Sequence, residues 1–236
     1  MKLKDKILDL WFPRRCAVCD EIVDGPGQEI CSSCKGKMIY IKEPCCMKCG
    51  KQLKKEEQEY CADCGRTEHT YIQGTALYDY GSMSDSIFRF KYAGRMEYAA
   101  FYGRELYEKK LHWLRARRAD ALVPVPIHPS RKKRRGYNQA ELIARRLSEL
   151  SGIPVEASLV RRVKKTRPLK GLSNSERQNN LKRAFKIDIN DVKLNTIVII
   201  DDIYTTGATI DSMAQVLKEK GVKKIYFMAL AVGRGI

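Results

Sequence analysis

Nine cysteines, all between residues 16 and 64, constrain this 236-residue chain more than any other feature of its sequence. Eight of them form two copies of one pattern, in which a CxxC pair is followed, after 11 intervening residues, by a second CxxC pair. The first copy comprises Cys16, Cys19, Cys31 and Cys34, and the second comprises Cys46, Cys49, Cys61 and Cys64. Thiolate pairs at this spacing are common ligands of tetrahedral Zn2+, so we expect two zinc ions.

Eight ligands leave no open coordination position on two zinc ions, which indicates structural rather than hydrolytic sites. The equal spacers favour sequential pairing, with the first four cysteines around one ion, and a cross-braced arrangement is the alternative. Cys45 does not keep the spacing and is left over. Gly50 and Gly65 each follow a CxxC pair and are expected to supply a positive φ in the turn. We interpret His69 as a surface histidine, because both tetrads are already complete.

The first residues predict neither a secretory signal nor a membrane span. Asp5 and Asp9 interrupt the apolar residues there, and no apolar run approaches the roughly 18 residues that a spanning helix needs. We therefore expect a cytoplasmic protein, in which such cysteines bind metal rather than form disulfides. Apolar residues at positions 3, 7, 10 and 11 predict one helical face. That face either docks on its own domain or makes peripheral contact with the inner face of the membrane.

The positive charge is concentrated in one part of the chain. Residues 1–70 contain 13 basic and 12 acidic side chains, whereas the remainder contains 32 basic and 16 acidic ones. Together with the cysteines, this predicts a zinc-binding domain over residues 1–70 and a second domain over residues 71–236. The basic excess of the second domain favours a polyphosphate or nucleic-acid partner, and a merely soluble basic surface is the alternative.

Beyond residue 70, strand patterns alternate with helical ones. Strands are predicted at residues 72–80, 121–127, 196–200 and 224–232. Helices are predicted at residues 96–114, from Asn138 as N-cap through residue 150, and at residues 209–220. This alternation is typical of an α/β fold with a parallel sheet flanked by helices.

The segment 197–209, IVIIDDIYTTGAT, is the most informative part of the second domain. A buried strand ends in Asp201 and Asp202, and a loop of threonines and glycine opens a helix. Backbone N–H groups, hydroxyls and a helix N-terminus can cradle a phosphate, and Gly207 lacks a Cβ that would block its approach. The two carboxylates suit hydrogen bonds from a ribose diol. A phosphate site beside a diol site describes a 5-phosphoribosyl group.

This segment resembles, at all thirteen positions, the phosphoribosyl-diphosphate (PRPP) signature of type I phosphoribosyltransferases. The resemblance implies that Asp201 and Asp202 are the catalytic pair and hold the ribose hydroxyls of PRPP, which binds together with Mg2+. It also implies a 5′-phosphate loop formed by Thr205, Thr206, Gly207, Ala208 and Thr209. Asp211, one turn into the helix, is expected to have no effect on phosphate binding.

Two basic segments complete this expected site. VPVP at residues 123–126 and GY at residues 136–137 are similar to a stretch of amidophosphoribosyltransferases, where the loop after this strand contacts pyrophosphate. Residues 161–183, with nine basic and one acidic side chain, match the position of a mobile loop that closes over such sites. The candidates for contact with pyrophosphate or with a nucleic-acid backbone are Arg131, Lys132, Lys133, Arg134, Arg135, Gly136, Lys164, Lys165 and Arg167. A glutaminase domain with an N-terminal nucleophilic cysteine is absent from the sequence, so ammonia transfer is not expected.

The double cysteine module, the RRGYNQA segment at residues 134–140 and the PRPP signature together resemble the ComF family over nearly the whole chain. The best-known members are competence proteins, implicated in handling incoming single-stranded DNA during natural transformation. The resemblance therefore implies PRPP, single-stranded DNA and competence helicases as partners. Other members occur in bacteria not known for competence.

Two functions remain open from the sequence. In the first, the protein handles single-stranded DNA and keeps its PRPP site as a sensor or a relic. In the second, it is a Mg2+-dependent phosphoribosyltransferase that acts on an unidentified small-molecule acceptor, unrelated to DNA uptake. The sequence contains no aromatic–acid pair that can be assigned to a nucleobase acceptor, and it therefore does not decide whether the site turns over.

Overall fold

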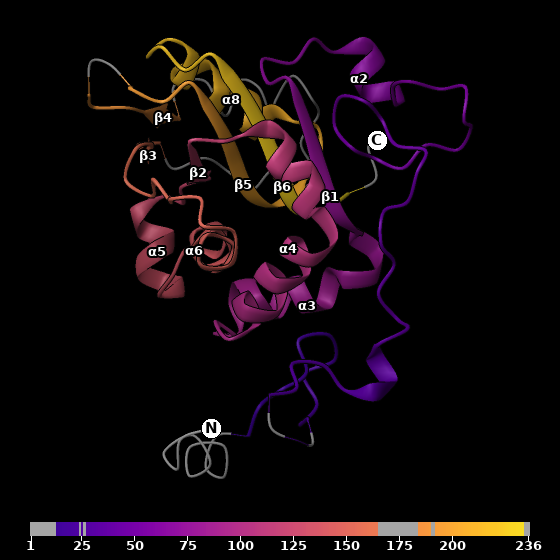
Figure 1. Ribbon diagram of the computed structural model, residues 1–236. Helices are drawn as coiled ribbons and strands as arrows, with labels where there is room; N and C mark the ends of the chain where they lie inside the picture. Colours follow the sequence, from indigo (N-terminus) through magenta and orange to yellow (C-terminus); the bar gives the residue numbers. More distant parts are fainter. Residues whose placement is uncertain (1–12, 24, 26, 165–183, 190–191, 234–236) are drawn as a thin grey trace.

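The computed structural model describes residues 13–23, 25, 27–164, 184–189 and 192–233. Its centre is a sheet of four parallel strands in the spatial order β1-β6-β5-β2 (Figure 1). The strands are β1 (Gln73–Asp79), β2 (Ala121–Pro124), β5 (Thr196–Tyr204) and β6 (Lys224–Val232). A parallel sheet with helical crossovers is the predicted architecture, and the expected strand at residues 224–232 is confirmed residue for residue.

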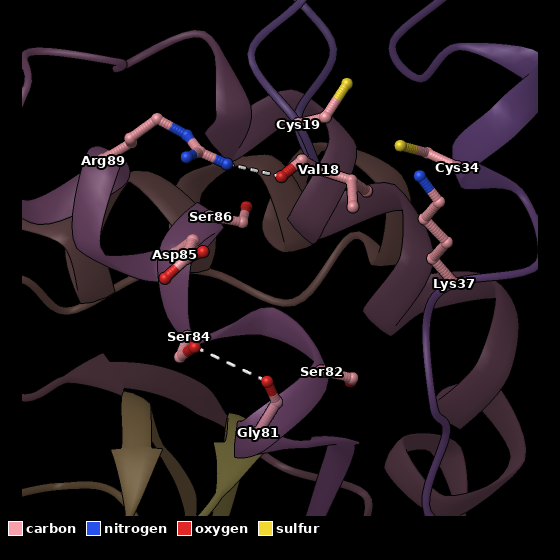
Figure 2. A pocket seen from close by; sticks show the side chains of 10 residues that line it. All are labelled: Val18, Cys19, Cys34, Lys37, Gly81, Ser82, Ser84, Asp85, Ser86 and Arg89. Atoms are coloured by element: carbon pink, nitrogen blue, oxygen red, sulfur yellow. Dashed lines mark hydrogen bonds between the residues drawn. The ribbon is translucent and has the colours of Figure 1, made fainter.

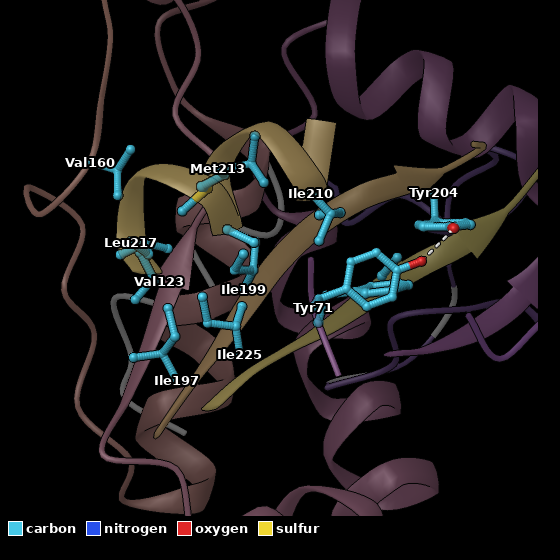
Figure 3. Packing of buried hydrophobic residues seen from close by; sticks show 14 of the residues in the cluster. Tyr71, Val123, Val160, Ile197, Ile199, Tyr204, Ile210, Met213, Leu217 and Ile225 are labelled. Atoms are coloured by element: carbon cyan, nitrogen blue, oxygen red, sulfur yellow. Dashed lines mark hydrogen bonds between the residues drawn. The ribbon is translucent and has the colours of Figure 1, made fainter. Parts of the chain in front are cut away.

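Both faces of this sheet are covered, because the strands β5 and β6 are apolar on both sides. Ile197 and Ile199 of β5 pack with helix α8 (Ala208–Lys218) on one face, as Figure 3 shows. Val198 and Ile200 pack on the other face with helices α3 (Tyr80–Tyr92), α4 (Tyr98–Arg117) and α6 (Gln139–Ser151). The period-2 alternation of a strand thus builds two separate cores from one run of β-branched residues.

Three helices agree with the sequence, and α3 was not predicted. The predicted helices at residues 96–114, 138–150 and 209–220 correspond to α4, α6 and α8, with boundaries that differ by up to three residues. Helix α3 was not predicted, because residues 80–92 contain a glycine and three serines, which disfavour a helix interior. The Asp79 side chain caps it by accepting a hydrogen bond from Gly81 N at 2.9 Å.

Two cysteine-rich segments flank the central layer: the first packs on helices α3 and α4, and the second lies next to β1 on the side of α8. Residues 13–34, named ribbon 1 here, contain the short helix η1 (Ser32–Cys34), and Ala17 packs into the core on the side of α3 and α4. Residues 44–66, named ribbon 2 here, contain helix α2 (Ala62–Arg66), and Cys46 and Cys49 pack into the core on the side of α8. Residues 39–41 join the two along the edge of β1, where Ile41 N donates to the Leu77 carbonyl at 2.9 Å.

Three local expectations need correction. Strand β5 does not end before Asp201 but continues through Tyr204, because β6 keeps pairing with it. Gly50 has a positive φ of 72°, as expected, whereas Gly65 lies inside α2 and has none. The segment 128–136, expected to be a loop, contains helix α5 (Pro129–Arg135), and residues 161–162 and 185–186 form a small antiparallel pair, β3 (Arg161–Arg162) with β4 (Phe185–Lys186). Within the described ranges, the helices are all too short or too polar to cross a membrane.

Candidate functional site

Two groups of four cysteines come together in the ribbons, and each group fits a zinc ion. All four sulfur atoms of a group lie within 4.8 Å of one another. The groups are Cys16, Cys19, Cys31 and Cys34 in ribbon 1, and Cys46, Cys49, Cys61 and Cys64 in ribbon 2. Four converging thiols are the donor set of a closed, structural zinc site. The pairing is therefore sequential, as favoured from the sequence, and the cross-braced alternative is wrong.

Backbone amides support the first tetrad. The N–H groups of Val18 and Cys31 donate to the sulfur of Cys16 at 3.5 Å and 3.3 Å. Such bonds orient a metal-binding thiolate. Cys45, the predicted spare cysteine, lies outside the second tetrad, and its thiol donates instead to the Lys42 carbonyl at 3.2 Å.

His69 is not a surface histidine, and that interpretation of the sequence is wrong. Its side chain is 0 % exposed. Its Nε2 lies 3.6 Å from the sulfur of Cys64, and its Nδ1 lies 2.7 Å from Oδ2 of Asp211 on α8. Because the tetrad is complete without it, His69 is a neighbour of a metal ligand rather than a ligand.

Asp201 and Asp202 lie in the last part of β5, where only one side of the strand is paired with a neighbour. Strand β2 pairs with β5 as far as Ile200, and the pairing with β6 continues beyond the two acids. Oδ1 of Asp201 accepts a hydrogen bond from Asp202 N at 2.8 Å, and Oδ1 of Asp202 forms an ion pair with Lys91 Nζ at 2.8 Å. The expected pair of carboxylates is thus held at the carboxyl end of the central strand, which is where α/β sheets bind ligands.

Charges of both signs surround these carboxylates. Desolvation by burial and the negative charge of Asp202 raise the pKa of Asp201 to about 7, against the opposing charges of Lys91 and Arg162. Burial, together with the positive charge of Arg131, lowers the pKa of Arg162 on β3 to about 10. Arg131 on α5 and Arg162 therefore belong to the same electrostatic neighbourhood as the two acids, which can take a ligand carrying both hydroxyls and anionic groups.

The expected phosphate loop connects β5 to α8. Thr205, Thr206 and Gly207 form a bend, and Gly207 is the N-cap of α8 with a φ of 83°. Ala208 and Thr209 begin the helix, and the N-cap provides no side-chain hydrogen bond to the first turn. Its first N–H groups are therefore available to an anion. Glycine is required at position 207 for two reasons. Any other residue would be strained at this positive φ, and its Cβ would lie only 2.8 Å from Tyr204 Oη.

The basic residues of α5 divide into two groups. Arg131 and Arg135, one turn apart, are partly buried, and Arg135 lies over the ring of Tyr92 with its Cζ 4.5 Å from the ring centroid. Lys132, Lys133 and Arg134 are exposed, and Gly136 ends the helix with a φ of 85°. Lys164 is exposed just after β3, whereas Lys165 and Arg167 lie outside the described residues.

A cavity of about 290 Å³ lies elsewhere, between ribbon 1 and the start of α3 (Figure 2). Its lining includes Cys19 and Cys34 from the ribbon, Lys37 just after it, and Ser82 and Asp85 from the helix. Residues of the IVIIDDIYTTGAT segment do not line it. This cavity is therefore separate from the candidate phosphoribosyl site.

Two family models match separate parts of the chain. Residues 7–65 match the family model of a double zinc ribbon domain, and residues 133–235 match that of a phosphoribosyl transferase domain. Competence protein F of Haemophilus influenzae is 33% identical over 223 residues, which cover 85% of this chain and 96% of that protein. The chain belongs to the ComF family.

Further relatives are named either as competence proteins or as DNA utilization proteins. Competence protein ComFC of Bacillus subtilis is 29% identical over 83% of this ComF-family chain and 80% of its own length. The DNA utilization protein YhgH of Escherichia coli K12 is 29% identical over 94% of this chain and 98% of its own length. The family-model matches confirm the expected fold, a type I phosphoribosyltransferase-like parallel sheet preceded by a double zinc ribbon.

Two residues of this ComF-family site were missed from the sequence. Lys91, the ion-pair partner of Asp202, lies on α3. Because this helix was not predicted, the sequence did not indicate that Lys91 would lie near the two acids. Arg162 lies in the basic segment 161–183 but was not selected. Its burial follows from strand alternation in β3, where Arg161 is exposed and Arg162 is buried.

Each ribbon should bind one zinc ion, which gives two per chain in metal analysis under reducing conditions. Cys19→Ser or Cys49→Ser should remove one ion and unfold the corresponding ribbon, because metal binding in such small modules supplies folding free energy. Cys45→Ser is the matched control and should keep both ions. A zinc content of one or none in the wild type would contradict this account.

Asp201 should make the stability of the fold depend on pH. Because its pKa is raised to about 7, the folded chain keeps a proton that the unfolded chain has already lost, so the unfolding free energy should fall as the pH rises toward 7. Asp201→Asn, which still accepts the hydrogen bond from Asp202 N, should be more stable than wild type at about pH 8.5, with an advantage that shrinks toward about pH 5.5. Chemical denaturation at a series of pH values measures the unfolding free energies of wild type and Asp201→Asn. A stability difference between Asp201→Asn and wild type that is constant with pH would contradict the assignment.

Proposed function

We propose that this ComF-family protein binds PRPP at the β5–α8 segment and handles incoming single-stranded DNA during natural transformation. The observation that carries the proposal is the arrangement at the end of β5, where two carboxylates precede an uncapped helix N-terminus. A diol site followed by a phosphate site suits a 5-phosphoribosyl group. The competence and DNA utilization names of the relatives support a role in DNA handling.

In the proposed PRPP complex, Asp201 and Asp202 accept hydrogen bonds from the ribose hydroxyls. The 5′-phosphate is held by Thr205, Thr206, Gly207, Ala208 and Thr209. The diphosphate, with Mg2+, faces Arg131 and Arg162, whose charges act on the same region as Asp201. Lys91, which neutralises Asp202 in the absence of ligand, shares that carboxylate with the ribose or is displaced by it.

The proposed DNA surface combines the exposed cations of α5 with two exposed aromatic side chains of α3. Phe88 and Tyr92 are 60% and 54% exposed, and their ring centroids lie 5.0 Å apart. Arg135 joins them to α5 through its contact with the Tyr92 ring. Cations that contact phosphates, next to aromatic rings on which bases stack, are the usual elements of sequence-tolerant single-strand binding. Lys164, Lys165 and Arg167 extend the basic character of this surface along the sequence.

The remaining parts of the proposal concern organisation and location. We assign residues 1–70 to the zinc-binding domain and residues 71–236 to the phosphoribosyltransferase-like domain. The protein acts in the cytoplasm, and the apolar face expected in residues 1–11 docks on its own domain, with peripheral contact at the inner face of the membrane as the alternative. A competence helicase is the proposed protein partner.

Titration calorimetry with Mg2+ present tests the PRPP site. Asp202→Ala and Thr206→Ala should each weaken PRPP binding, the first by about 1.5–3 kcal/mol because a charged hydrogen-bond acceptor is lost. Asp85→Ala, on the exposed side of α3 beside the separate cavity, is the control and should bind like wild type. A wild-type protein that does not bind PRPP would rule out the proposed site.

Salt dependence tests the DNA surface. If five phosphates of a single strand are engaged, the logarithm of affinity should fall with the logarithm of salt concentration at a slope of roughly −3.5. The triple variant Lys132→Ala, Lys133→Ala and Arg134→Ala should flatten the slope to roughly −1.4, because three phosphate contacts are lost. An affinity that is insensitive to salt, or unaffected by the triple substitution, would favour a small-molecule enzyme instead.

The aromatic residues should act differently from the cations. Phe88→Ala with Tyr92→Ala should weaken binding at every salt concentration and leave the slope unchanged, because stacking releases no counterions. Tyr60→Ala, an equally exposed tyrosine in ribbon 2, is the matched control and should have no effect.

A further inference from the structure

The short segment between ribbon 2 and β1 is bonded to residues on both sides of the phosphate loop. Before the loop, Tyr204 at the end of β5 shares a buried hydrogen bond with Tyr71, with 2.8 Å between the two hydroxyl oxygens (Figure 3). After the loop, Asp211 in the first turn of α8 uses both carboxylate oxygens on this segment. One accepts from Thr70 N at 2.8 Å, and the other lies 2.7 Å from Nδ1 of His69.

His69 also fills the space beneath the loop itself. A Cβ built on Gly207 would lie 2.9 Å from Cε1 of His69, so the imidazole occupies the space that a side chain at this position would need. The ring of Tyr71 stacks on the imidazole, with centroids 4.8 Å apart and planes inclined by 22°. A displacement of the His69 ring would therefore be transmitted to the backbone at Gly207 and, through Asp211, to the first turn of α8.

The other side of His69 faces the second cysteine tetrad. An ionised carboxylate only accepts hydrogen bonds, so Nδ1 donates to Asp211 and Nε2 is directed at the sulfur of Cys64, 3.6 Å away. Ribbon 2 is also fixed to the sheet, because Gly74 N in β1 donates to the Lys48 carbonyl at 2.8 Å. A zinc ion bound by the four thiols would fix the position of Cys64 and, through it, that of the imidazole.

Ribbon 1 is bonded to a different part of the molecule. Its Asp20 forms an ion pair with Arg95 at 2.8 Å and accepts a hydrogen bond from Tyr98 at 2.5 Å. Its Glu29 forms an ion pair with Arg104 on α4 at 2.6 Å. These contacts attach the first zinc site to α4 and to the turn before it, on the opposite face of the sheet from α8. Ribbon 1 therefore serves as an internal control for ribbon 2, because it has the same four-cysteine pattern but contacts a different part of the molecule.

We propose that the second zinc site, acting through His69 and Asp211 as positioning residues, sets the geometry of the 5′-phosphate loop, whereas the first zinc site does not. The inference rests on the proposed PRPP site and adds a function to ribbon 2 within it. It also reverses the expectation from the sequence that Asp211 has no effect on phosphate binding. Asp211 touches no phosphate and acts by holding α8 against residues 69 and 70.

The test measures the two ends of PRPP separately. Calorimetry with ribose 5-phosphate, with pyrophosphate and Mg2+, and with PRPP is compared for wild type, His69→Gln and Asp211→Asn. Both variants should lose about tenfold in affinity for ribose 5-phosphate and for PRPP, keep their affinity for pyrophosphate, and retain two zinc ions. Asp20→Asn, which weakens the attachment of ribbon 1, is the matched control and should leave all three affinities unchanged.

The absorption spectrum of Co2+-substituted protein provides a second test that does not depend on binding constants. If the loop and the second metal site are coupled, the coupling must act in both directions. In Co2+-substituted protein, ribose 5-phosphate should shift the cobalt–thiolate bands of the wild type and leave those of His69→Gln unchanged. This readout also separates positioning from a general loss of stability, which would alter the bands before any ligand is added.

The outcomes distinguish the inference from the function on which it rests. If wild type binds PRPP but His69→Gln and Asp211→Asn bind ribose 5-phosphate as tightly as wild type, the inference is wrong and the PRPP site stands. An equal loss for ribose 5-phosphate and pyrophosphate would likewise contradict it, because the effect would not be confined to the loop. Failure of the wild type to bind PRPP would overturn both.

Discussion

The parallel pairing of β5 with β2 and β6 is the interaction on which the rest of the structure depends. Alternate residues of β5 build the cores on both faces of the sheet, so one run of β-branched residues holds α8 on one side and α3, α4 and α6 on the other. Because β2 stops pairing at Ile200, the last part of β5 presents Asp201 and Asp202 at an open edge. The phosphate loop and the N-terminus of α8 follow directly after this strand. The carboxylates and the phosphate loop are therefore neighbours in space because they are neighbours in the chain.

The two ribbons use this sheet differently, although their cysteine patterns are copies of each other. Ribbon 1 packs on α3 and α4, ribbon 2 lies next to β1 on the side of α8, and residues 39–41 cover the edge of β1 between them. Ribbon 1 is attached to α4 and to the turn before it through Asp20 and Glu29, and its Ala17 packs into the core on that side. Ribbon 2 contributes buried cysteines to the core beneath α8 and approaches the phosphate loop through His69. In our proposal, a repeated structural module has thereby acquired a positioning role in one of its copies.

The features that could be predicted from the sequence are those determined by residues close together in the chain. The zinc tetrads follow from CxxC spacing, strand β6 from its continuous apolar run, and the candidate phosphoribosyl segment from thirteen consecutive residues. The contact between His69 and Asp211 joins residues 142 positions apart, and only the packing of ribbon 2 against α8 brings them together. Lys91 was missed for a related reason, since α3 forms despite weak local propensity because its apolar face packs on the sheet.

In our proposal, helix α5 of this ComF-family protein serves two ligands, because Arg131 faces the diphosphate of PRPP and the adjacent Lys132, Lys133 and Arg134 contact a DNA single strand. This proposal is tested most directly by adding PRPP with Mg2+ to a complex of the protein with fluorescently labelled single-stranded DNA, at constant ionic strength, and following anisotropy. We expect PRPP to displace the DNA and ribose 5-phosphate not to displace it. Asp202→Ala should bind DNA normally but need more PRPP than wild type for the same displacement, because its affinity for PRPP is lower. DNA that stays bound when PRPP saturates its site would contradict the account.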